Sequence, residues 1–180
     1  TPKTSSAASD VYKRQPQQPE DGAMKPTAIL EREHRIIEQV LDCLEALSAR
    51  ARSGDGFDRS DAADALRFLR ELADEAHHGK EEEVLFPALE ANGVPKSVGP
   101  VAVMLAEHEL GRAEVRTMAG ALENGDDDAF ADAADRFVTL LREHIGKEDN
   151  ILFALANAVI DDGALDEAYA RAEASFGAER

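Results

Sequence analysis

Two stretches of this chain repeat one another: residues 77–89 read HHGKEEEVLFPAL, and residues 144–156 read HIGKEDNILFALA. In register, His77 aligns with His144 and Glu81 aligns with Glu148, so both copies contain H-x-x-x-E. Four residues on an α-helix make slightly more than one turn and rise about 6 Å. The histidine and the glutamate of each copy therefore project from the same face of a helix. Each copy can bring an imidazole and a carboxylate to one metal ion, or bridge two.

The repeat also selects between two possible registers. His78 and Glu82 have the same spacing as His77 and Glu81, but the counterpart of His78 in the second copy is Ile145, which cannot bind a metal. We therefore predict that His77 and Glu81 are the ligands. The alternative register, in which His78 and Glu82 replace them, stays open.

Composition predicts a helical protein with an acidic surface. The 180 residues are enough for one domain with a sizeable core, and 43% of them are hydrophobic, as in globular proteins. Ala, Leu, Glu and Arg are abundant and aromatic residues are few, which favours an all-α fold. The net charge of −17 repels phosphate groups, so we expect neither nucleic acid nor an anionic membrane as a partner.

Location and redox chemistry follow from what the sequence lacks. No apolar run approaches 18 residues, so we expect no membrane span, and the absence of a signal-peptide pattern predicts a cytoplasmic protein. Cys43 is the only cysteine, which excludes an intrachain disulfide and a thiolate-rich zinc or iron–sulfur site. We expect Cys43 to be a small buried residue of an apolar helix.

The chain divides into a polar leader and one helical domain. Residues 1–23 are rich in Ser, Gln and Pro and are predicted to be disordered; the alternative is a cloning or sequence-assembly remnant, with Met24 as the natural start. Residues 24–180 form the predicted domain. Apolar stripes at helical spacing predict four long helices, over residues 27–53, 58–91, 100–124 and from 127 onward.

We expect these four helices to pack as an antiparallel up-down-up-down four-helix bundle, because their connections are short. Thr27 is the expected N-cap of the first helix. Pro87 predicts a kink in the second helix. A short fifth C-terminal helix follows residues 161–163 and is expected to lie across the bundle.

Ionisable residues occupy the apolar stripe of every long helix. A carboxylate costs several kcal/mol to bury, so such a group needs a compensating charge, which a pair of metal ions supplies. Imidazole with carboxylate is typical of non-haem iron, with zinc and manganese as alternatives. A single histidine on an apolar face is more often a satisfied core residue, but four such helices with a duplicated H-x-x-x-E favour a metal site. The predicted ligands are His34, His77, Glu81, His108, His144 and Glu148.

Further polar residues near these positions are interpreted as supports for the ligands or as parts of the solvated face. They are His78, Glu82, Glu83, Glu107, Glu109 and Asp149.

The four segments EREHRII at 31–37, HHGKEEEVLFPAL at 77–89, LAEHELGR at 105–112 and HIGKEDNILF at 144–153 resemble the hemerythrin-like, or HHE cation-binding, family. The resemblance covers residues 24 to about 160. It implies a non-haem centre of two iron ions held by the six residues named above. It also implies a small ligand such as oxygen, peroxide or nitric oxide.

One departure from the family pattern carries a prediction. Hemerythrins have H-x-x-x-H on their third helix, whereas here His108 is flanked at that spacing by Met104 and Arg112. Arginine stays protonated and is not a ligand. We therefore expect one iron to lack a ligand relative to the oxygen carriers, and the centre to oxidise in air rather than carry oxygen reversibly.

Three functions remain open at this point. The chain is a di-iron peroxidase or oxidase, or a protein that stores or senses iron or repairs iron centres without turnover, or a metal-free acidic bundle. The sequence does not decide whether the chain is an enzyme.

Overall fold

The computed structural model describes residues 25–54, 56–161 and 163. The predicted leader and the predicted fifth helix lie outside these residues. Over the described part of the chain every regular element is helical and no strand occurs, so the all-α prediction is confirmed. None of the described helices is both long enough and apolar enough to cross a membrane.

Two of the four long helices combine α-helical and π-helical segments. The first helix is α1 (Pro26–Ser53) and the third is α4 (Pro100–Asn124). The second helix consists of α2 (Arg59–Phe68), η1 (Leu69–His78), η2 (Glu81–Leu85) and α3 (Phe86–Ala91). The fourth consists of α5 (Asp127–Lys147), η3 (Glu148–Leu152) and α6 (Phe153–Val159).

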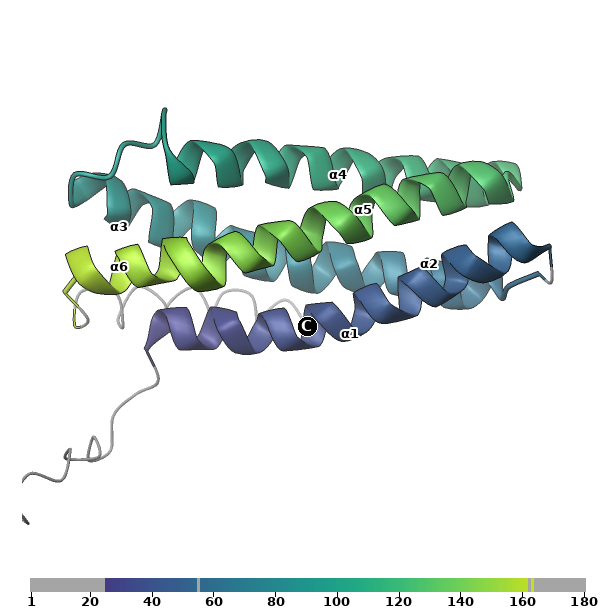
Figure 1. Ribbon diagram of the computed structural model, residues 1–180, viewed down its shortest axis with the longest axis horizontal. Coiled ribbons are helices and arrows are strands. Elements are labelled where there is room, and N and C mark those ends of the chain that lie inside the picture. The colour runs from purple at the N-terminus through teal and green to yellow at the C-terminus, as the bar shows by residue number, and fades with distance from the viewer. Residues whose placement is uncertain (1–24, 55, 162, 164–180) are drawn as a thin grey trace, which may run out of the picture.

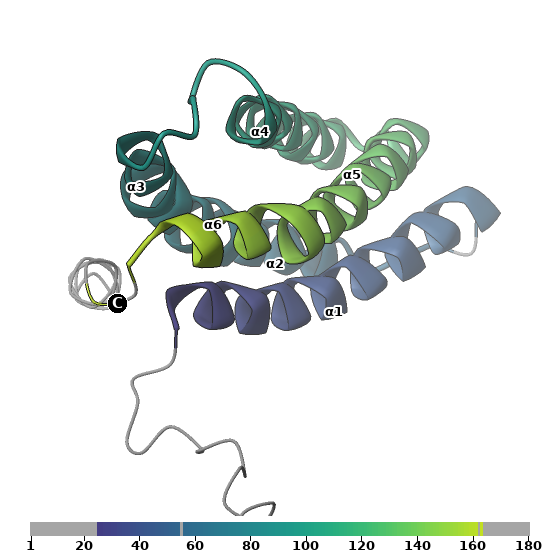
Figure 2. The same ribbon diagram turned by 60° about the vertical axis from the view of Figure 1, so that its left-hand side comes forward.

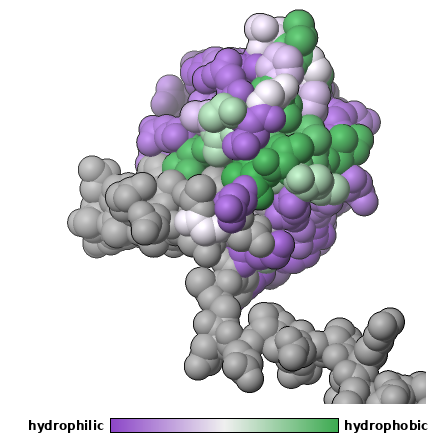
Figure 3. Space-filling model, turned by 90° about the vertical axis from the view of Figure 1, so that its left-hand side faces the viewer, coloured by the Kyte–Doolittle hydropathy of each residue, from purple (hydrophilic) through white to green (hydrophobic). Residues whose placement is uncertain are grey.

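The four helices lie side by side, and successive connections lie at opposite ends of the molecule (Figure 1). α5 packs against both α1 and α4. Figure 2 shows the same helices from the end that carries α3 and α6. Seen directly in Figure 3, this end has a band of hydrophobic surface among hydrophilic residues.

Short polar signals set the helix ends. Asp58 and Asp126 accept hydrogen bonds from backbone N–H groups in the first turns of α2 and α5. Gly54 follows α1 with a left-handed backbone, which glycine adopts without steric cost. The prediction for Thr27 was wrong: α1 begins at Pro26, and the Thr27 hydroxyl hydrogen-bonds Asn157 instead.

The apolar core is divided in two by a layer of ionisable residues. On α1, Leu30 belongs to one apolar cluster and Ile37 to the other, with His34 between them. On α4, Met104 belongs to the same apolar cluster as Leu30, and beyond His108 the core resumes in the apolar cluster that contains Ile37. The site is therefore sealed by hydrocarbon toward both ends of the bundle.

The expectation for Cys43 was also wrong, because this residue is exposed. Its neighbours Leu41 and Leu44 occupy the core-facing positions of α1, and the side chain of Cys43 points away from them. It lines a shallow groove together with Val40 and Phe68.

Candidate metal centre

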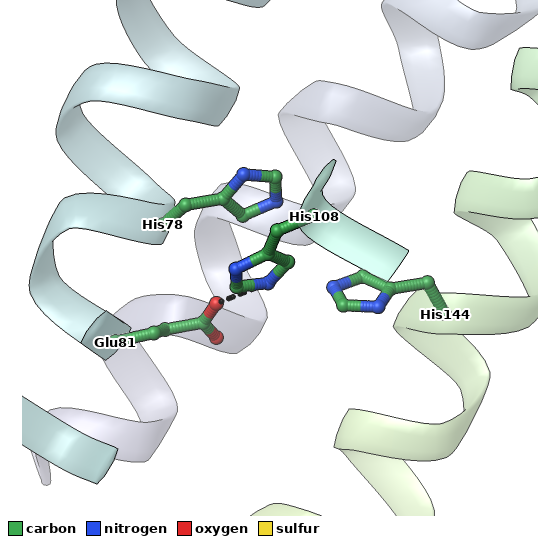
Figure 4. A group of neighbouring side chains, drawn as sticks. All are labelled: His78, Glu81, His108 and His144. Atoms are coloured by element: carbon green, nitrogen blue, oxygen red, sulfur yellow. Dashed lines mark ion pairs between the residues drawn. The ribbon is translucent and has the colours of Figure 1, made fainter. Parts of the chain in front are cut away.

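Seven buried side chains meet in the middle of the bundle. We call His34, His77, Glu81 and Glu148 the first cluster, and His78, Glu81, His108 and His144 the second cluster. Within each cluster, one ligand-type atom of every residue lies within 4.8 Å of the others. Figure 4 shows the second cluster, with three imidazoles and one carboxylate converging from three different helices. The structure thus brings all six sequence-predicted ligands together; their role as ligands stays a prediction.

Glu81 belongs to both clusters. Its Oε1 lies 3.6 Å from Nε2 of His77, in the first cluster, and its Oε2 lies 3.4 Å from Nε2 of His108, in the second. The residue is 0% exposed. One carboxylate therefore turns one oxygen toward each cluster, which is the arrangement of a group that bridges two ions.

Glu148 is placed in the same way from the fourth helix. Its Oε2 lies 3.2 Å from Nε2 of His34 and its Oε1 lies 3.3 Å from Nε2 of His144. Among the described residues, none of the four oxygens of Glu81 and Glu148 has a hydrogen-bond partner. A buried carboxylate without such partners costs several kcal/mol, so bound cations fit these oxygens.

The imidazoles are held from behind by carboxylates. In four of the rings Nδ1 lies within hydrogen-bond distance of a carboxylate on a different helix, and Nε2 faces the cluster. This is how histidine ligands are usually oriented toward a metal. The pairs are His34–Asp149 (2.7 Å), His77–Glu33 (2.9 Å), His108–Glu82 (2.7 Å) and His144–Glu107 (3.1 Å).

Two lysines complete the repeat. Lys80 pairs with Glu33, which holds His77, and Lys147 pairs with Glu107, which holds His144. Three of the carboxylates that hold rings, Glu82, Glu107 and Asp149, were predicted from sequence to support the ligands or to lie on the solvated face, and they do support the rings.

Glu33 was missed by the sequence analysis. A signal was present, because Glu33 precedes His34 just as Glu107 precedes His108. Of the other residues in that predicted group, Glu83 and Glu109 are exposed.

Without a bound ion, the charges of the core shift the pKa values in opposite directions. Burial opposes protonation of His34 and His108, but their carboxylate partners outweigh it and raise both pKa values to about 9. Burial and the neighbouring Glu81 charge raise the pKa of Glu148 to about 8. Burial and the adjacent His108 lower the pKa of His144 to about 3. In the metal-free protein, protons therefore supply part of the positive charge that these carboxylates require.

This geometry agrees with a comparison against protein families: residues 25–156 match the model of the hemerythrin HHE cation-binding domain. The chain belongs to the hemerythrin HHE family. Over 103 residues it is 31% identical to the iron-sulfur cluster repair protein YtfE of Yersinia pseudotuberculosis (serotype IB). That alignment covers 53% of this chain and 46% of YtfE, so the chain spans about half the length of this relative. No solved structure matches.

The structure adds one residue, His78, to the buried centre of this hemerythrin HHE chain. We interpreted His78 as a supporting or solvated residue, because its counterpart in the repeat is Ile145. Instead His78 is buried, lies in the second cluster and stacks on His108 with ring centroids 3.7 Å apart. The buried groups of the two clusters include both His77 and His78, and which of them bind a metal stays a prediction.

A π-helix explains why both adjacent histidines face the core. His77 and His78 close the segment η1, whose widened turn rotates successive side chains by less than an α-helix does. Two further π-helical turns begin at Glu81 and at Glu148, whose carbonyls accept from Phe86 and Phe153 five residues later. The fourth helix has no proline in this region, so Pro87 is not required for such a turn.

His78 also removes the reason to expect a missing ligand. The second cluster contains three imidazoles and the first contains two, so the total is five although the third helix contributes only His108. Arg112 does not enter the clusters; it pairs with Asp74, Glu82 and Glu109. Whether one ion lacks a ligand stays a prediction, because the structure shows where the five imidazoles lie and not which of them bind a metal.

Proposed function

We propose that this chain holds two metal ions, with iron preferred, one in each cluster, and that the centre binds or reacts with oxygen, peroxide or nitric oxide. In this proposal Glu81 and Glu148 bridge the ions. His34 and His77 complete the first site. His78, His108 and His144 complete the second.

The observation that carries the proposal is the pair of buried carboxylates between five imidazoles. Glu81 and Glu148 are each 0% exposed and each faces both clusters. A purely structural core gains nothing from four buried carboxylate oxygens without hydrogen-bond partners, since each of them must be desolvated. Two divalent cations between these oxygens and the inner imidazole nitrogens would compensate that cost.

The protein groups around the ions have separate tasks. The carboxylates on Nδ1 hold the proton of the ring on that side, which leaves Nε2 free to face an ion. In the first cluster, Nε2 of His34 and Nε2 of His77 lie 3.0 Å apart, so both aim at the same point. The apolar clusters above and below exclude bulk water. When bound, a pair of iron ions supplies redox-active centres for small oxygen or nitrogen ligands.

A cavity beside the second cluster supports a small ligand. It has a volume of about 130 Å³ and is lined by His78, by apolar residues that include Leu69 and Phe137, and by charged residues that include Asp74 and Arg112. A cavity of roughly 10–15 Å³ suffices for one water molecule, so this space accepts a diatomic molecule or peroxide. The net charge of −17 gives no support to a nucleic-acid ligand.

A second function is favoured by the similarity to an iron-sulfur cluster repair protein. In that case the chain would store or sense iron, or serve the repair of iron centres, without turnover of a small ligand. The same clusters would serve, with iron or nitric oxide as the exchanged species. Recovery of activity by a damaged iron–sulfur enzyme on addition of the loaded protein is the test of this alternative.

Metal analysis tests the proposal most directly. The protein, purified without a histidine tag from iron-replete cells, should contain two ions per chain, with iron as the main metal. Chelation should lower the melting temperature, because an ion that binds only the folded state stabilises it. A chain that takes up no metal, and whose melting curve chelation leaves unchanged, would be a metal-free bundle.

Stopped-flow absorbance then separates the functions. The anaerobically reduced, iron-loaded protein should change its spectrum within the mixing experiment when it meets oxygen, peroxide or nitric oxide. Peroxide consumed in excess of the protein identifies an enzyme, and a spectral change that argon reverses identifies a carrier or sensor. No spectral response to any of the three ligands would leave only the storage or repair function.

A further inference from the structure

The second cluster depends on a residue that does not belong to it. Arg112, on α4, donates through Nε to Oδ1 of Asp74 at 2.7 Å and through Nη2 to Oε1 of Glu82 at 2.9 Å. Both acceptor oxygens also face histidines. Asp74 Oδ1 lies 3.5 Å from Nδ1 of His78, and Glu82 Oε1 lies 2.7 Å from Nδ1 of His108. A single guanidinium therefore joins the carboxylates behind two of the three imidazoles.

The first cluster has a corresponding arginine, but in a different position. Arg35, which follows His34 directly, pairs with Asp149, the carboxylate that holds His34, and with Glu38 at 2.7 Å. The position that corresponds to Arg35 after His108 is occupied by Glu109.

The arginine and the glutamate thus exchange positions between the segment that follows His34 and the segment that follows His108. Glu38, four residues after His34, corresponds to Arg112, four residues after His108. The reversal moves the guanidinium one turn along α4, where it reaches Asp74 in addition to Glu82. The same reversal leaves the arginine less exposed: the side chain of Arg112 is 23% exposed, against 53% for Arg35. Asp74 is the partner of His78, the one imidazole without a counterpart in the repeat.

His78 is not close-packed on every side, because it lines the cavity of about 130 Å³ together with Asp74 and Arg112. It also stacks on His108, with an interplanar angle of 14°. The carboxylates that Arg112 joins lie behind both rings: Glu82 is within hydrogen-bond distance of His108, and Asp74 lies 3.5 Å from Nδ1 of His78, which has no hydrogen-bond partner among the described residues.

We propose that Arg112 is a positioning residue that fixes His78 and His108 and thereby sets the metal affinity of the second cluster, while Arg35 serves the first cluster alone. This inference rests on the proposed metal function. It explains how the chain obtains its fifth imidazole without a second histidine on the third helix.

The test compares Arg112→Gln with Arg35→Gln in stepwise titrations of the metal-free protein with Co(II), a probe whose absorption reports its ligands. Arg112→Gln should weaken one of the two binding steps by about 10–100-fold, as removal of an outer partner of a histidine ligand usually does, and leave the other unchanged. Arg35→Gln should weaken the other step. Arg136→Gln, which changes only a surface pair with Glu114, should match the wild type.

A spectroscopic readout separates positioning from a general loss of stability. In the Co(II)-loaded protein, the shifted N–H proton signal of His108 should exchange faster with solvent in Arg112→Gln than in Arg35→Gln. Arg112→Lys should restore only part of the affinity, because an ammonium cannot reproduce the fixed fork that spans two carboxylates. Asp74→Asn, which weakens the links of Asp74 to His78 and to Arg112 but leaves the pair of Arg112 with Glu82, should weaken the same step and serves if Arg112→Gln does not fold.

Two results would overturn the inference while the proposed function stands: wild-type affinity at both steps in Arg112→Gln, or equal weakening of both steps. Failure of the wild-type protein to bind Co(II) or iron would instead overturn the proposed function itself.

Discussion

The two clusters are built on the same repeated pattern but are not equal. Each has a histidine from an H-x-x-x-E helix, a histidine from a neighbouring helix, and carboxylates behind both rings. The second cluster adds His78, with Asp74 and Arg112 behind it. A duplicated motif therefore fixes where ligands can be placed, and a local change in helix geometry then makes one site richer in imidazole than the other.

The largest effect should come from the two carboxylates that face both clusters. Glu81→Ala and Glu148→Ala should each remove an oxygen from both sites, and in each variant the first cluster, which keeps two imidazoles, should lose its ion before the second, which keeps three. Metal analysis of the purified variants checks this, with the exposed Glu83→Ala as a control that keeps the full complement. Equal loss of the two ions within each variant would mean that the clusters are equivalent after all.

The difference between the clusters can be removed by one substitution. His78→Ala leaves the second cluster with two imidazoles, the same number as the first, so the two affinities should become similar. His77→Ala should widen the difference, because the first cluster then keeps a single imidazole. Each substitution should weaken the metal affinity of its cluster by at least about 10–100-fold, which is the usual effect of removing an outer partner of a histidine ligand. Competition titrations measure it, and unchanged affinities in His78→Ala would exclude this residue as a ligand.

Metal uptake should strengthen as the pH rises, in both clusters. In the metal-free protein His34 and His108, one from each cluster, have pKa values raised to about 9, and Glu148 has a pKa of about 8. Below these values an ion must displace protons, so the apparent affinity should increase from pH 6 to about pH 9 and then level off. Calorimetry in buffers of different ionisation enthalpy measures the released protons. An affinity that is independent of pH over this range would contradict the prediction.

The smallest expected effect is a difference in folding stability between variants of the two lysines of the repeat, Lys80 and Lys147. Lys80 is 1% exposed, so Lys80→Met should destabilise the metal-free protein by up to about 3 kcal/mol, because it leaves the charge of Glu33 with less compensation. The side chain of Lys147 is 36% exposed, and Lys147→Met should cost less than about 1 kcal/mol. Urea unfolding measures both, against the exposed Lys96→Met. Equal losses of stability in the two variants would show that the different burial of Lys80 and Lys147 has no effect.

Much of the fold and of the site could be predicted from local patterns. The apolar stripes predicted the four helices, because Leu, Ile, Phe and Ala recur along the sequence with the 3.6-residue period of a helix. The same spacing placed His34, His77, His108 and His144 on core-facing positions. The duplicated H-x-x-x-E identified Glu81 and Glu148, since carboxylates in an apolar stripe are rare without a compensating charge.

Only the tertiary structure decided which other residues join the site. His78 lies in the site because a π-helical turn rotates it into the core, and no residue pattern in the sequence predicted that turn. Glu33 supports His77 through a contact that depends on how two helices sit against one another, across a gap that helical periodicity does not encode. The sequence by itself determined the helices and the shared carboxylates, and the π-helical geometry of the folded chain decided that the two clusters would differ.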